Sequence, residues 1–596
     1  MLDENYSYDP KKRIWKKKNG TDFIYRDGSE TVLMDILKNV RDKSVFSHEL
    51  NQFQKDWATT YHLSGARSNL VRPFEKHLLS DKTVLELGCG CGAITRYLGE
   101  VAKIVFAVEG SEERGCVSAE RCADLDNVNV IIEKIQDLPE TIGKFDVVTL
   151  IGVLEYSGNY GLSPVQMLEH ARKFLVENGV LILAIENRLG LKYFSGVPED
   201  HLAIPWAGIT GGYKKNGVST WSRKELIAFL VEAGFKSCKQ FVPIPDYKLP
   251  YTIITSSGLD ASQDKLVLEP ILASSQRRYE NPALFNLKAA WKSVIDAGLL
   301  ADLADSLCFV AYASENAFPA HEKGLLVQHY GNGAHADKHF AKVLSIVEDN
   351  GNLFVTRKKL FPDFHFNHGD YKQVIEDEPY YYGSRVEDNA RHCVMCKNWT
   401  LSDFAETFSP WIYFILEHKS HDDFLPGKFL DLAPFNLIVS PAGKTHPFDL
   451  EWQKTKPVPY QYILVRGLIN TFHRIQPVSM PKVGTSLQYK ELIKGIFSYF
   501  SLEYDENHIE KIWDSENFAH ILELPCLSWE AATKHAMRVE INDVSSLLAL
   551  VDCCASLDVQ PAHLYDYIIS LQKNIVSMQT QLKNMAKFVD NLKKRR

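Results

Sequence analysis

The apolar positions between residues 83 and 251 come in short runs that are separated by helical stretches. These runs are TVLELG, IVFAVEG, VNVII, FDVVTLIGVL and GVLILAIE. Runs rich in β-branched residues and bounded by Gly, Asp or Pro are typical of strands buried on both faces, and their alternation with helices indicates a parallel sheet. We therefore expect a doubly wound α/β domain over residues 81–258.

The pattern changes on either side of this domain. Residues 1–80 are predicted to form an N-terminal helical lid region, and the Ala/Leu-rich residues 259–320 a helical connector. From Gly324 to Pro362 the pattern becomes hairpin-like, with the turn signal Asp349-Asn350-Gly351-Asn352 between two apolar runs. Mostly helical sequence follows, so we expect a separate α+β domain over residues 321–557.

The last segment, residues 562–596, has apolar residues spaced alternately by 4 and 3 from Leu564 to Leu592. A sustained period of 3.5 predicts a coiled coil, which would join copies of the chain into a homo-oligomer. A terminal helix docked on the globular body stays open as the alternative. The closing Lys593–Arg596 run is either a solvated end or a peripheral contact with anionic lipid.

Composition narrows the class of protein. The chain has 596 residues, of which 45% are hydrophobic and 24% charged, as in folded globular proteins of several domains. A net charge of −8 argues against a nucleic-acid partner for the whole molecule. Eleven scattered cysteines indicate a reducing compartment, and no window is apolar enough to span a membrane. We expect a cytoplasmic protein, at most attached to the inner face of the cytoplasmic membrane.

The sharpest motif is a strand that runs into a Gly-rich turn, Val84 to Gly92. Glycines at 88, 90 and 92 let the backbone turn sharply and approach a ligand where a Cβ would collide. Two classes compete, dinucleotide oxidoreductases and S-adenosylmethionine (SAM) methyltransferases. The dinucleotide fingerprint GxGxxG fails, because Ala93 and Ile94 follow Gly92 and no third glycine stands at the required offset.

Glu86 before the turn, in the spacing E-x-G-x-G-x-G, resembles motif I of the class I SAM-dependent methyltransferases. In that Rossmann-like family an acidic residue at the end of the next strand binds the ribose, and Glu109 stands there. The stretch Ile135-Gln136-Asp137-Leu138-Pro139 matches the adenine loop, although Lys134 replaces the usual acidic residue. The resemblance implies SAM as cofactor, bound by Glu86, Gly88, Cys89, Gly90, Gly92, Glu109, Gly110, Ile135, Gln136 and Asp137.

Polar residues on both sides of the sheet are candidates for the acceptor side. The segment Trp57–Arg67 stands where this family commonly carries a helical lid, and Tyr61 and Arg67 are expected to contact the cofactor, Arg67 through the SAM carboxylate or an anionic acceptor. Transfer to a sugar hydroxyl needs a base, for which His201 and His62 are the candidates. Transfer to a phosphate oxygen needs none.

A second motif lies in the C-terminal half. Asp431 and Asn436 have the D-x4-N spacing of a kinase catalytic loop, and Asp449 follows thirteen residues later. This resembles the aminoglycoside-phosphotransferase branch of the kinase fold, with Asp431 as catalytic base, Asn436 and Asp449 as magnesium ligands and Lys358 as the phosphate-binding lysine for ATP. No His or Arg precedes Asp431 and DLE replaces DFG, so an active kinase and a degenerate kinase-like domain both stay open.

The whole order resembles the chain-terminating methyltransferase-kinases of bacterial O-antigen biosynthesis. The resemblance implies methylation of a surface-polysaccharide terminus, part of lipopolysaccharide biosynthesis, coupled to phosphorylation if the kinase-like domain is active, with a glycan or glycolipid acceptor. Two alternatives remain: a non-catalytic SAM-binding scaffold that recruits glycosyltransferases, and a small-molecule methyltransferase with a pseudokinase domain.

Overall fold

The computed structural model describes residues 4–18, 25, 28–262, 266–268, 271–272, 285–315, 320–331, 338–364, 369–516 and 527–538. The chain divides into two compact units, Met1–Val539 and Glu540–Arg596. The second unit lies outside the described residues, and with it the predicted coiled coil of residues 562–596. The coiled coil therefore stays a prediction.

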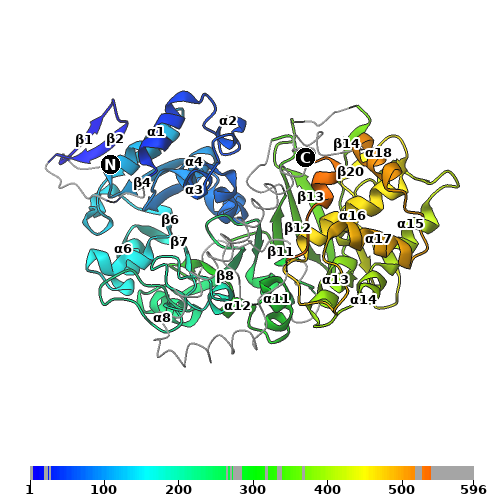
Figure 1. Cartoon of the computed structure of the whole chain (residues 1–596). Helices are drawn as coiled ribbons and strands as arrows, with labels where there is room; N and C mark the ends of the chain where they lie inside the picture. The colour runs from blue at the N-terminus through cyan, green and yellow to red at the C-terminus, as the bar shows by residue number, and fades with distance from the viewer. Residues whose placement is uncertain are drawn as a thin grey trace, which may run out of the picture. The chain divides into compact units, whose positions relative to one another are not determined.

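Five parallel strands form the centre of the N-terminal sheet (Figure 1). They are β3 (Thr83–Leu87), β4 (Ile104–Glu109), β5 (Val128–Ile132), β6 (Phe145–Ile151) and β7 (Leu175–Glu186). Their order is β5-β4-β3-β6-β7, and each neighbouring pair is parallel. The predicted doubly wound, Rossmann-like arrangement is confirmed.

Helices cover both faces of this sheet because alternate strand residues point to opposite sides. The helices that connect and follow its strands are α4 (Ala93–Val101), α5 (Glu112–Arg121), α6 (Pro164–Lys173), α7 (Leu191–Phe194) and α8 (Arg223–Glu232). Val84 packs in one core with Ile94 of α4. Its neighbour Leu85 packs in a second core with Leu168 of α6 and Leu226 of α8.

The N-terminal region combines a hairpin with the predicted helices. Strands β1 (Tyr6–Asp9) and β2 (Ile14–Lys17) pair with each other, and β2 extends the sheet by pairing in parallel with β5. Helices α1 (Glu30–Asn39), α2 (His48–Asn51) and α3 (Trp57–Leu63) follow. The hairpin was not expected, because four-residue strands give too short an alternation to stand out in a sequence.

The expected connector of residues 259–320 includes a strand of the N-terminal sheet. Helices α9 (Ser256–Ala261), α11 (Leu287–Asp296) and α12 (Leu300–Leu303) are helical as predicted. Strand β10 (Ser306–Tyr312) then lies between β7 and β8 (Ser237–Ile244), antiparallel to both. All seven residues of β10 are buried, so the segment completes the sheet that the preceding strands began.

The sheet continues without interruption into the C-terminal half. Strand β8 pairs with β9 (Thr252–Ile254), and the antiparallel series then runs through β11 (Leu325–Tyr330), β12 (Lys342–Asp349), β13 (Asn352–Lys359) and β15 (Glu378–Pro379). The hairpin predicted at residues 349–352 is confirmed, since Asp349 pairs with Asn352. Asn350 and Gly351 have φ of 48° and 81°, as a two-residue type I′ turn requires.

A mostly helical part with short strands follows. Its helices are α13 (Val386–Met395), α14 (Leu401–Glu406), α15 (Ser409–His418), α16 (Tyr460–Arg474), α17 (Tyr489–Tyr499), α18 (Glu506–Glu516) and α19 (Trp529–Thr533). The strands are β14 (Tyr371–Gln373), β16 (Ser384–Arg385), β17 (Phe424–Leu425), β18 (Leu437–Val439), β19 (Thr445–Pro447), β20 (Trp452–Lys454) and β21 (Val458–Pro459). The C-terminal half is therefore a mixed α/β region.

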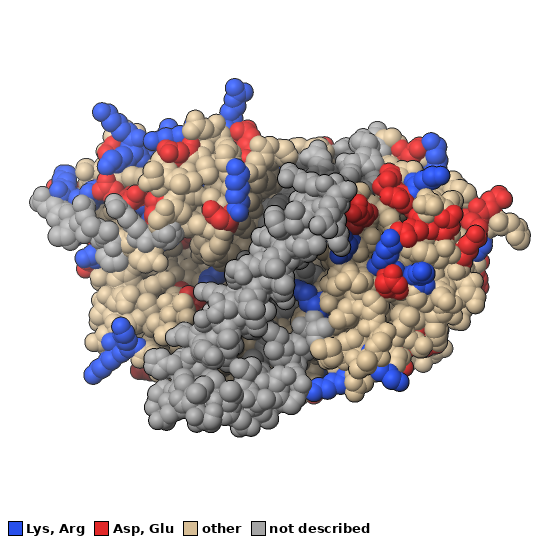
Figure 2. Space-filling model, viewed as in Figure 1, with Lys and Arg blue, Asp and Glu red and all other residues tan. Residues whose placement is uncertain are grey.

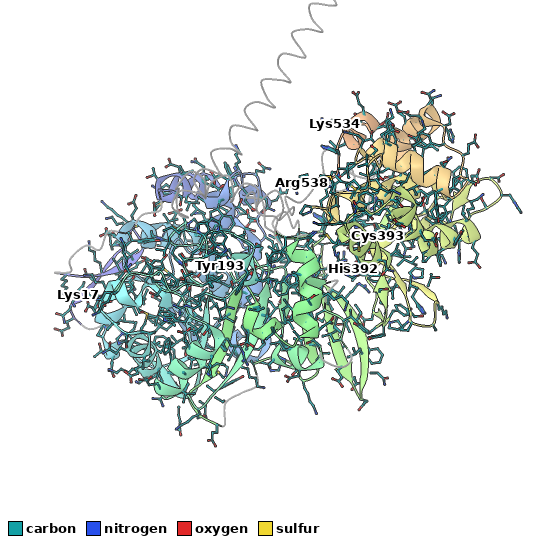
Figure 3. All side chains as sticks on the ribbon, turned by 60° about the horizontal axis from the view of Figure 1, so that its bottom comes forward. Lys17, Tyr193, His392, Cys393, Lys534 and Arg538 are labelled. Atoms are coloured by element: carbon teal, nitrogen blue, oxygen red, sulfur yellow. The ribbon has the colours of Figure 1, made fainter. Side chains whose placement is uncertain are left out.

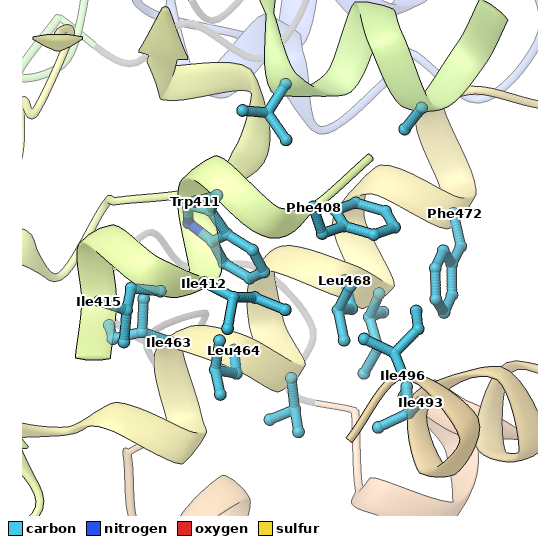
Figure 4. Close-up of a cluster of buried hydrophobic side chains, with 14 of the residues drawn as sticks. Phe408, Trp411, Ile412, Ile415, Ile463, Leu464, Leu468, Phe472, Ile493 and Ile496 are labelled. Atoms are coloured by element: carbon cyan, nitrogen blue, oxygen red, sulfur yellow. The ribbon is translucent and has the colours of Figure 1, made fainter. Parts of the chain in front are cut away.

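Trp411 of α15 belongs to the buried core of this region, as do Phe408, Leu468 and Phe472 (Figure 4). Gly467 of α16 lies against it, because a Cβ at this position would come within 2.5 Å of the Trp411 ring. Figure 3 shows how densely side chains fill both halves, with Tyr193 on α7 in the first and His392 and Cys393 on α13 in the second.

Both signs of charge are interspersed over the face in Figure 2. Within the described ranges, no helix has the length and apolar character that a membrane crossing requires.

Candidate active site and a second cavity

A cavity of about 410 Å³ opens at the carboxyl ends of the parallel strands. Open α/β sheets bind their ligands at this edge, where the strand order reverses. Its walls come from the Gly-rich turn after β3, the end of β4, the segments after β6 and β7, and helix α3. This cavity therefore brings together the two ends of the predicted site, the cofactor turn and the acceptor side.

The Gly-rich turn has the shape that only glycine allows. Gly88, Gly90 and Gly92 have φ of 81°, 55° and 84°. A Cβ on Gly88 would come within 2.4 Å of Val153, and one on Gly92 within 2.8 Å of the Ser118 backbone. The turn is thus held tightly against its neighbours while Gly88, Cys89 and Gly90 line the cavity. Gly92 begins α4 and is not among the lining residues.

Glu109 ends β4 at the cavity wall. Its two carboxylate oxygens accept hydrogen bonds from the backbone N–H groups of Gly90, at 2.9 Å, and Ser111, at 3.0 Å. An ionised carboxylate can accept about four hydrogen bonds, so Glu109 retains acceptor capacity toward the cavity. That placement suits a ligand with a pair of hydroxyl groups, as a ribose has.

Glu86 and Arg67 form the buried end of the cofactor region. Burial raises the pKa of Glu86 to about 7, although a Thr95 hydrogen bond and the Arg67 charge oppose the shift. The Arg67 guanidinium lies 4.3 Å from the centre of the Tyr61 ring and donates to the Lys248 carbonyl at 2.8 Å. Its Nε is buried and has no hydrogen-bond partner in the part of the chain that the structure describes. The structure therefore leaves this arginine with a donor for an anionic group such as a ligand carboxylate.

The predicted adenine loop is only partly at the cavity. Ile135 of this loop lines the cavity, whereas Gln136 and Asp137 do not. Gly110, which follows β4, also lines it. The Ile135 carbonyl bonds to His170 Nε2 at 2.6 Å, which fixes the short 3₁₀ turn of Ile135–Asp137. Taken together, the glycine cradle, Glu109, Arg67 and Ile135 fit SAM: carboxylate, ribose and adenine each have a matching wall.

The acceptor end contains a cluster that the sequence did not reveal as a unit. Glu155 follows β6, Glu186 ends β7 and His201 lies beyond α7, and one ligand atom of each comes within 4.8 Å of the other two. Both glutamates are buried, and the Oε2 atom of each has no hydrogen-bond partner among the described residues. Their position after two neighbouring parallel strands was the available signal, because such positions meet at one edge of the sheet.

Both predicted base candidates line this cavity. Burial opposes protonation of His201, but the carboxylates of Glu155 and Glu199 outweigh it and raise the His201 pKa to about 11. His201 is therefore protonated at neutral pH and is a poor proton acceptor in this state. His62 is buried beside the Tyr61 ring, with ring centres 4.9 Å apart.

A second cavity of about 310 Å³ lies in the C-terminal half. Aliphatic side chains of the sheet, Val327, Leu344, Ile346 and Val355, form one wall. Asp431, Asn436 and Asp449, the three residues of the second sequence motif, are all on the other wall. The D-x4-N pattern thus belongs to a cavity with one apolar side and one polar side.

Cations of the chain already engage the two aspartates. Arg466 pairs with Asp431 at 2.8 Å, and Arg357 donates to Asp449 at 3.2 Å. Burial raises the pKa of Asp431 to about 6, although Arg466 opposes the shift. Asn436 uses its amide nitrogen to bond the backbone carbonyls of Asp431, at 2.9 Å, and Asp449, at 3.3 Å. Arg357 and Lys342 also pair with Glu378 and Glu451, so three carboxylates face two cations beside Asp449, and magnesium ligation by Asn436 and Asp449 stays a prediction.

The choice of Lys358 as phosphate-binding lysine needs correction. Lys358 is exposed and does not line the second cavity, whereas its neighbour Arg357 is buried and does. Successive side chains of a strand point to opposite faces, so Arg357 and Lys358 lie on opposite faces of β13 and only one of them can face the cavity. Lys342 of β12 also faces Asp449, at 3.6 Å.

Comparisons with known proteins identify a methyltransferase domain in the part of the chain that carries the Gly-rich turn. The protein family described as "Methyltransferase domain" matches residues 78–194. A curated relative, the ribosomal protein arginine N-methyltransferase rmt3 of Schizosaccharomyces pombe, is 28% identical over 174 residues. That match spans 28% of this chain and 31% of the relative, so the chain matches about a third of that protein.

Solved structures give weaker similarities of the same kind. A SAM-dependent methyltransferase of Thermotoga maritima is 16% identical at a TM-score of 0.26, over 45% of this chain and 98% of its own. Magnesium protoporphyrin IX methyltransferase of Synechocystis PCC 6803, with bound SAH, is 16% identical at a TM-score of 0.25, over 35% and 87%. Both TM-scores are low, and the assignment rests on the sequence match: residues 78–194 are a class I SAM-dependent methyltransferase domain.

Proposed function

We propose that this chain transfers the methyl group of SAM to a hydroxyl group at the terminus of a glycan of the bacterial surface-polysaccharide type. The observation that carries the proposal is the single cavity that joins the cofactor turn to the buried Glu155–Glu186–His201 cluster. SAM, when bound, supplies an electrophilic methyl group. The chain's residues must then bind both molecules, exclude water and take one proton.

The cavity walls support a carbohydrate acceptor. Trp57, Tyr61, Tyr156 and Tyr160 line the cavity and offer aromatic surfaces to the apolar face of a sugar ring. The carboxylates of the cluster can accept hydrogen bonds from sugar hydroxyls. The combination of aromatic walls and buried acceptors favours a polyhydroxylated ligand over an apolar one.

Glu155 is placed to accept the hydroxyl proton. An alcohol is a weak nucleophile at neutral pH and needs a base within hydrogen-bond reach. Glu155 is 1% exposed, and its Oε2 has no donor within the described chain. Tyr247 and Lys248 donate to the other glutamate, Glu186, at 3.2 Å and 2.6 Å, and so leave Glu155 as the freer carboxylate.

The test is transfer of labelled methyl from SAM by the full chain to a panel of surface-glycan extracts. We expect label in glycan, a loss of at least 100-fold in Glu155→Gln, on the order expected for a general base, and unchanged SAM affinity in that variant. Glu112→Gln, on the surface of α5, is the matched control and should transfer normally. Ribosomal proteins are tested as a second set of acceptors, because the Schizosaccharomyces pombe relative is a ribosomal protein arginine N-methyltransferase.

Three outcomes would count against the proposal. Label in ribosomal protein alone would show that the glutamates hold an arginine side chain and not a sugar. Label in a small molecule alone would favour a small-molecule methyltransferase. SAM binding without transfer to any acceptor would favour the scaffold that recruits glycosyltransferases.

The second cavity supports a second candidate function, nucleotide binding by the C-terminal half. Its apolar residues suit a base, and Arg357, which lines the cavity, suits a phosphate. We expect ATP to bind without magnesium and the binding to weaken at least tenfold in Arg357→Gln, with Lys358→Gln as the neighbouring control. Magnesium-dependent transfer of labelled phosphate from ATP to the glycan, lost in Asp431→Ala, would instead establish an active kinase.

A further inference from the structure

We propose that Glu155, Glu186 and His201 form a divalent-cation site inside the methyl-transfer cavity. Within the described residues they are the group of three metal-ligating side chains whose ligand atoms converge. They come from three separate segments of the chain, so the sheet edge, and not a local motif, assembles them.

The distances suit an ion after a small contraction. His201 Nε2 lies 3.8 Å from Glu155 Oε1 and 3.9 Å from Glu186 Oε2, beyond hydrogen-bond distance. Ligand atoms at about 2.1 Å from a common ion lie roughly 3.0–3.5 Å apart. His201 Nε2 is thus a few tenths of an ångström too far from each carboxylate, and all three ligand atoms lie within 4.8 Å of one another.

The buried carboxylate oxygens point to a ligand that the chain itself does not supply. The Oε2 atoms of Glu155 and Glu186 are buried and have no hydrogen-bond partner, on side chains that are 1% and 0% exposed. Lys248 and Tyr247 both contact Glu186 through Oε1, which leaves Oε2 toward His201. A buried carboxylate oxygen without a donor is unfavourable unless a cation or a bound molecule satisfies it.

Glu199 orients the histidine as metal sites commonly do. It accepts from His201 Nδ1 at 3.1 Å and from the backbone N–H groups of His201 and Leu202 at 2.8 Å and 2.7 Å. A carboxylate on one ring nitrogen fixes the ring and directs the other nitrogen to the metal. Here it directs Nε2 toward Glu155 and Glu186.

The local charge also favours a cation. The cluster and its immediate neighbours hold four carboxylates, those of Glu155, Glu186, Glu199 and Asp200, and two ammonium groups, those of Lys192 and Lys248. Lys192 and Lys248 both bind Asp200, at 3.0 Å and 2.8 Å. Two negative charges therefore remain, and a divalent cation would balance them where a proton on His201 balances only one.

One imidazole and two carboxylates suit Mn²⁺ or Zn²⁺ and leave coordination positions open to the cavity. What the ion does there rests on the proposed function. It would bind the acceptor oxygen and lower the pKa of its hydroxyl, while one oxygen of Glu155 ligates the ion and the other accepts the proton.

The test measures Mn²⁺ binding to EDTA-treated full-length protein through the decrease in the EPR signal of free Mn²⁺. We expect one saturable ion per chain, bound at least tenfold more weakly in Glu155→Gln and in Glu186→Gln, with SAM affinity unchanged as evidence of folding. Glu199→Gln should also weaken binding about 10–100-fold, as loss of an orienting carboxylate does. Glu112→Gln is the control, because its carboxylate bonds to Lys12 on the surface of α5 and its loss should leave Mn²⁺ affinity unchanged. Asp449→Asn tests the competing acidic cavity in the C-terminal half.

Binding that is absent at millimolar Mn²⁺, or lost in Asp449→Asn but retained in Glu155→Gln, would overturn the assignment. Equal affinity of Glu199→Gln and wild type would overturn the role of His201 as ligand. Transfer of methyl to glycan at full rate in excess EDTA would remove the inference and leave the proposed function standing. Mn²⁺ bound at the cluster with no label in glycan would support the cation site and count against the proposed function.

Discussion

Replacement of Glu109 by glutamine tests the cofactor site most directly. In the wild-type chain both oxygens of Glu109 accept backbone N–H groups, from Gly90 at 2.9 Å and Ser111 at 3.0 Å, and the remaining lone pairs face the cavity. Glutamine has the same shape, but its amide nitrogen is a donor and must face a donor. The variant therefore loses a loop contact and the charge that strengthens any bond to a ribose hydroxyl.

The expected magnitude follows from the two hydroxyl contacts of a ribose. A hydrogen bond to a charged group contributes about 1.5–3 kcal/mol and one between neutral groups about 0.5–1.5 kcal/mol. The difference over two bonds is about 2–3 kcal/mol, which corresponds to a roughly 30- to 150-fold weaker affinity for SAM.

Isothermal titration of the full chain with SAM and with S-adenosylhomocysteine measures this change. Both ligands carry the same ribose, so both affinities should fall by the same factor. Glu112→Gln is the matched control, because that carboxylate lies three residues away and bonds to Lys12 at 2.5 Å on the surface. If Glu109→Gln binds SAM as tightly as wild type and stays folded, the ribose role of Glu109 is refuted.

Three further predictions concern stability, each measured by urea denaturation of the full chain without ligand. Burial raises the pKa of Glu86 from 4.5 to about 7, so the folded state holds its proton more tightly than the unfolded chain and stability falls as pH rises through this window. Glu86→Gln should accordingly match wild type below pH 4.5 and exceed it by about 3 kcal/mol above pH 7, at 1.36 kcal/mol per unit; an equal gain at both ends would contradict the cause. Gly467→Ala places a Cβ within 2.5 Å of Trp411, and we expect a loss of about 1–2 kcal/mol because overpacking outweighs the gain in helix propensity; a more stable variant would show that the ring can move aside. Asp388→Asn removes the carboxylate that pairs with two buried arginines, Arg385 at 2.9 Å and Arg391 at 2.5 Å, which should cost about 3–5 kcal/mol; a neutral result would mean that Glu387, 3.8 Å and 3.9 Å from them, is a sufficient counter-charge.

Local pattern was sufficient for the elements whose cause is local. The β-branched runs predicted the five parallel strands because a strand buried on both faces needs a continuous apolar run. Glycines at 88, 90 and 92 predicted a sharp turn at the cofactor, since each has a positive φ that other residues rarely adopt. Asn350 and Gly351 predicted the hairpin for the same reason.

Features that depend on long-range pairing escaped the sequence. Strand β10 is separated from β7 by more than a hundred residues, and nothing near it indicates that it inserts between β7 and β8. The sequence pattern favoured Lys358 as the phosphate-binding residue, but the register of β13 directs Arg357, and not Lys358, to the second cavity. Register is set by the partner strands, and a single sequence does not contain that pairing in readable form.

The methyltransferase domain, its Gly-rich turn and the carboxylate at the end of β4 could be predicted from the amino-acid sequence, because each depends on residues close together in the chain. The convergence of Glu155, Glu186 and His201 beside that turn, and the pairing of Asp431 with Arg466 and of Asp449 with Arg357, depend on the three-dimensional fold. The physical reason is that burial and charge balance arise from neighbours in space. A carboxylate that looks ordinary in the sequence becomes a site when the sheet edge removes its water and supplies no donor.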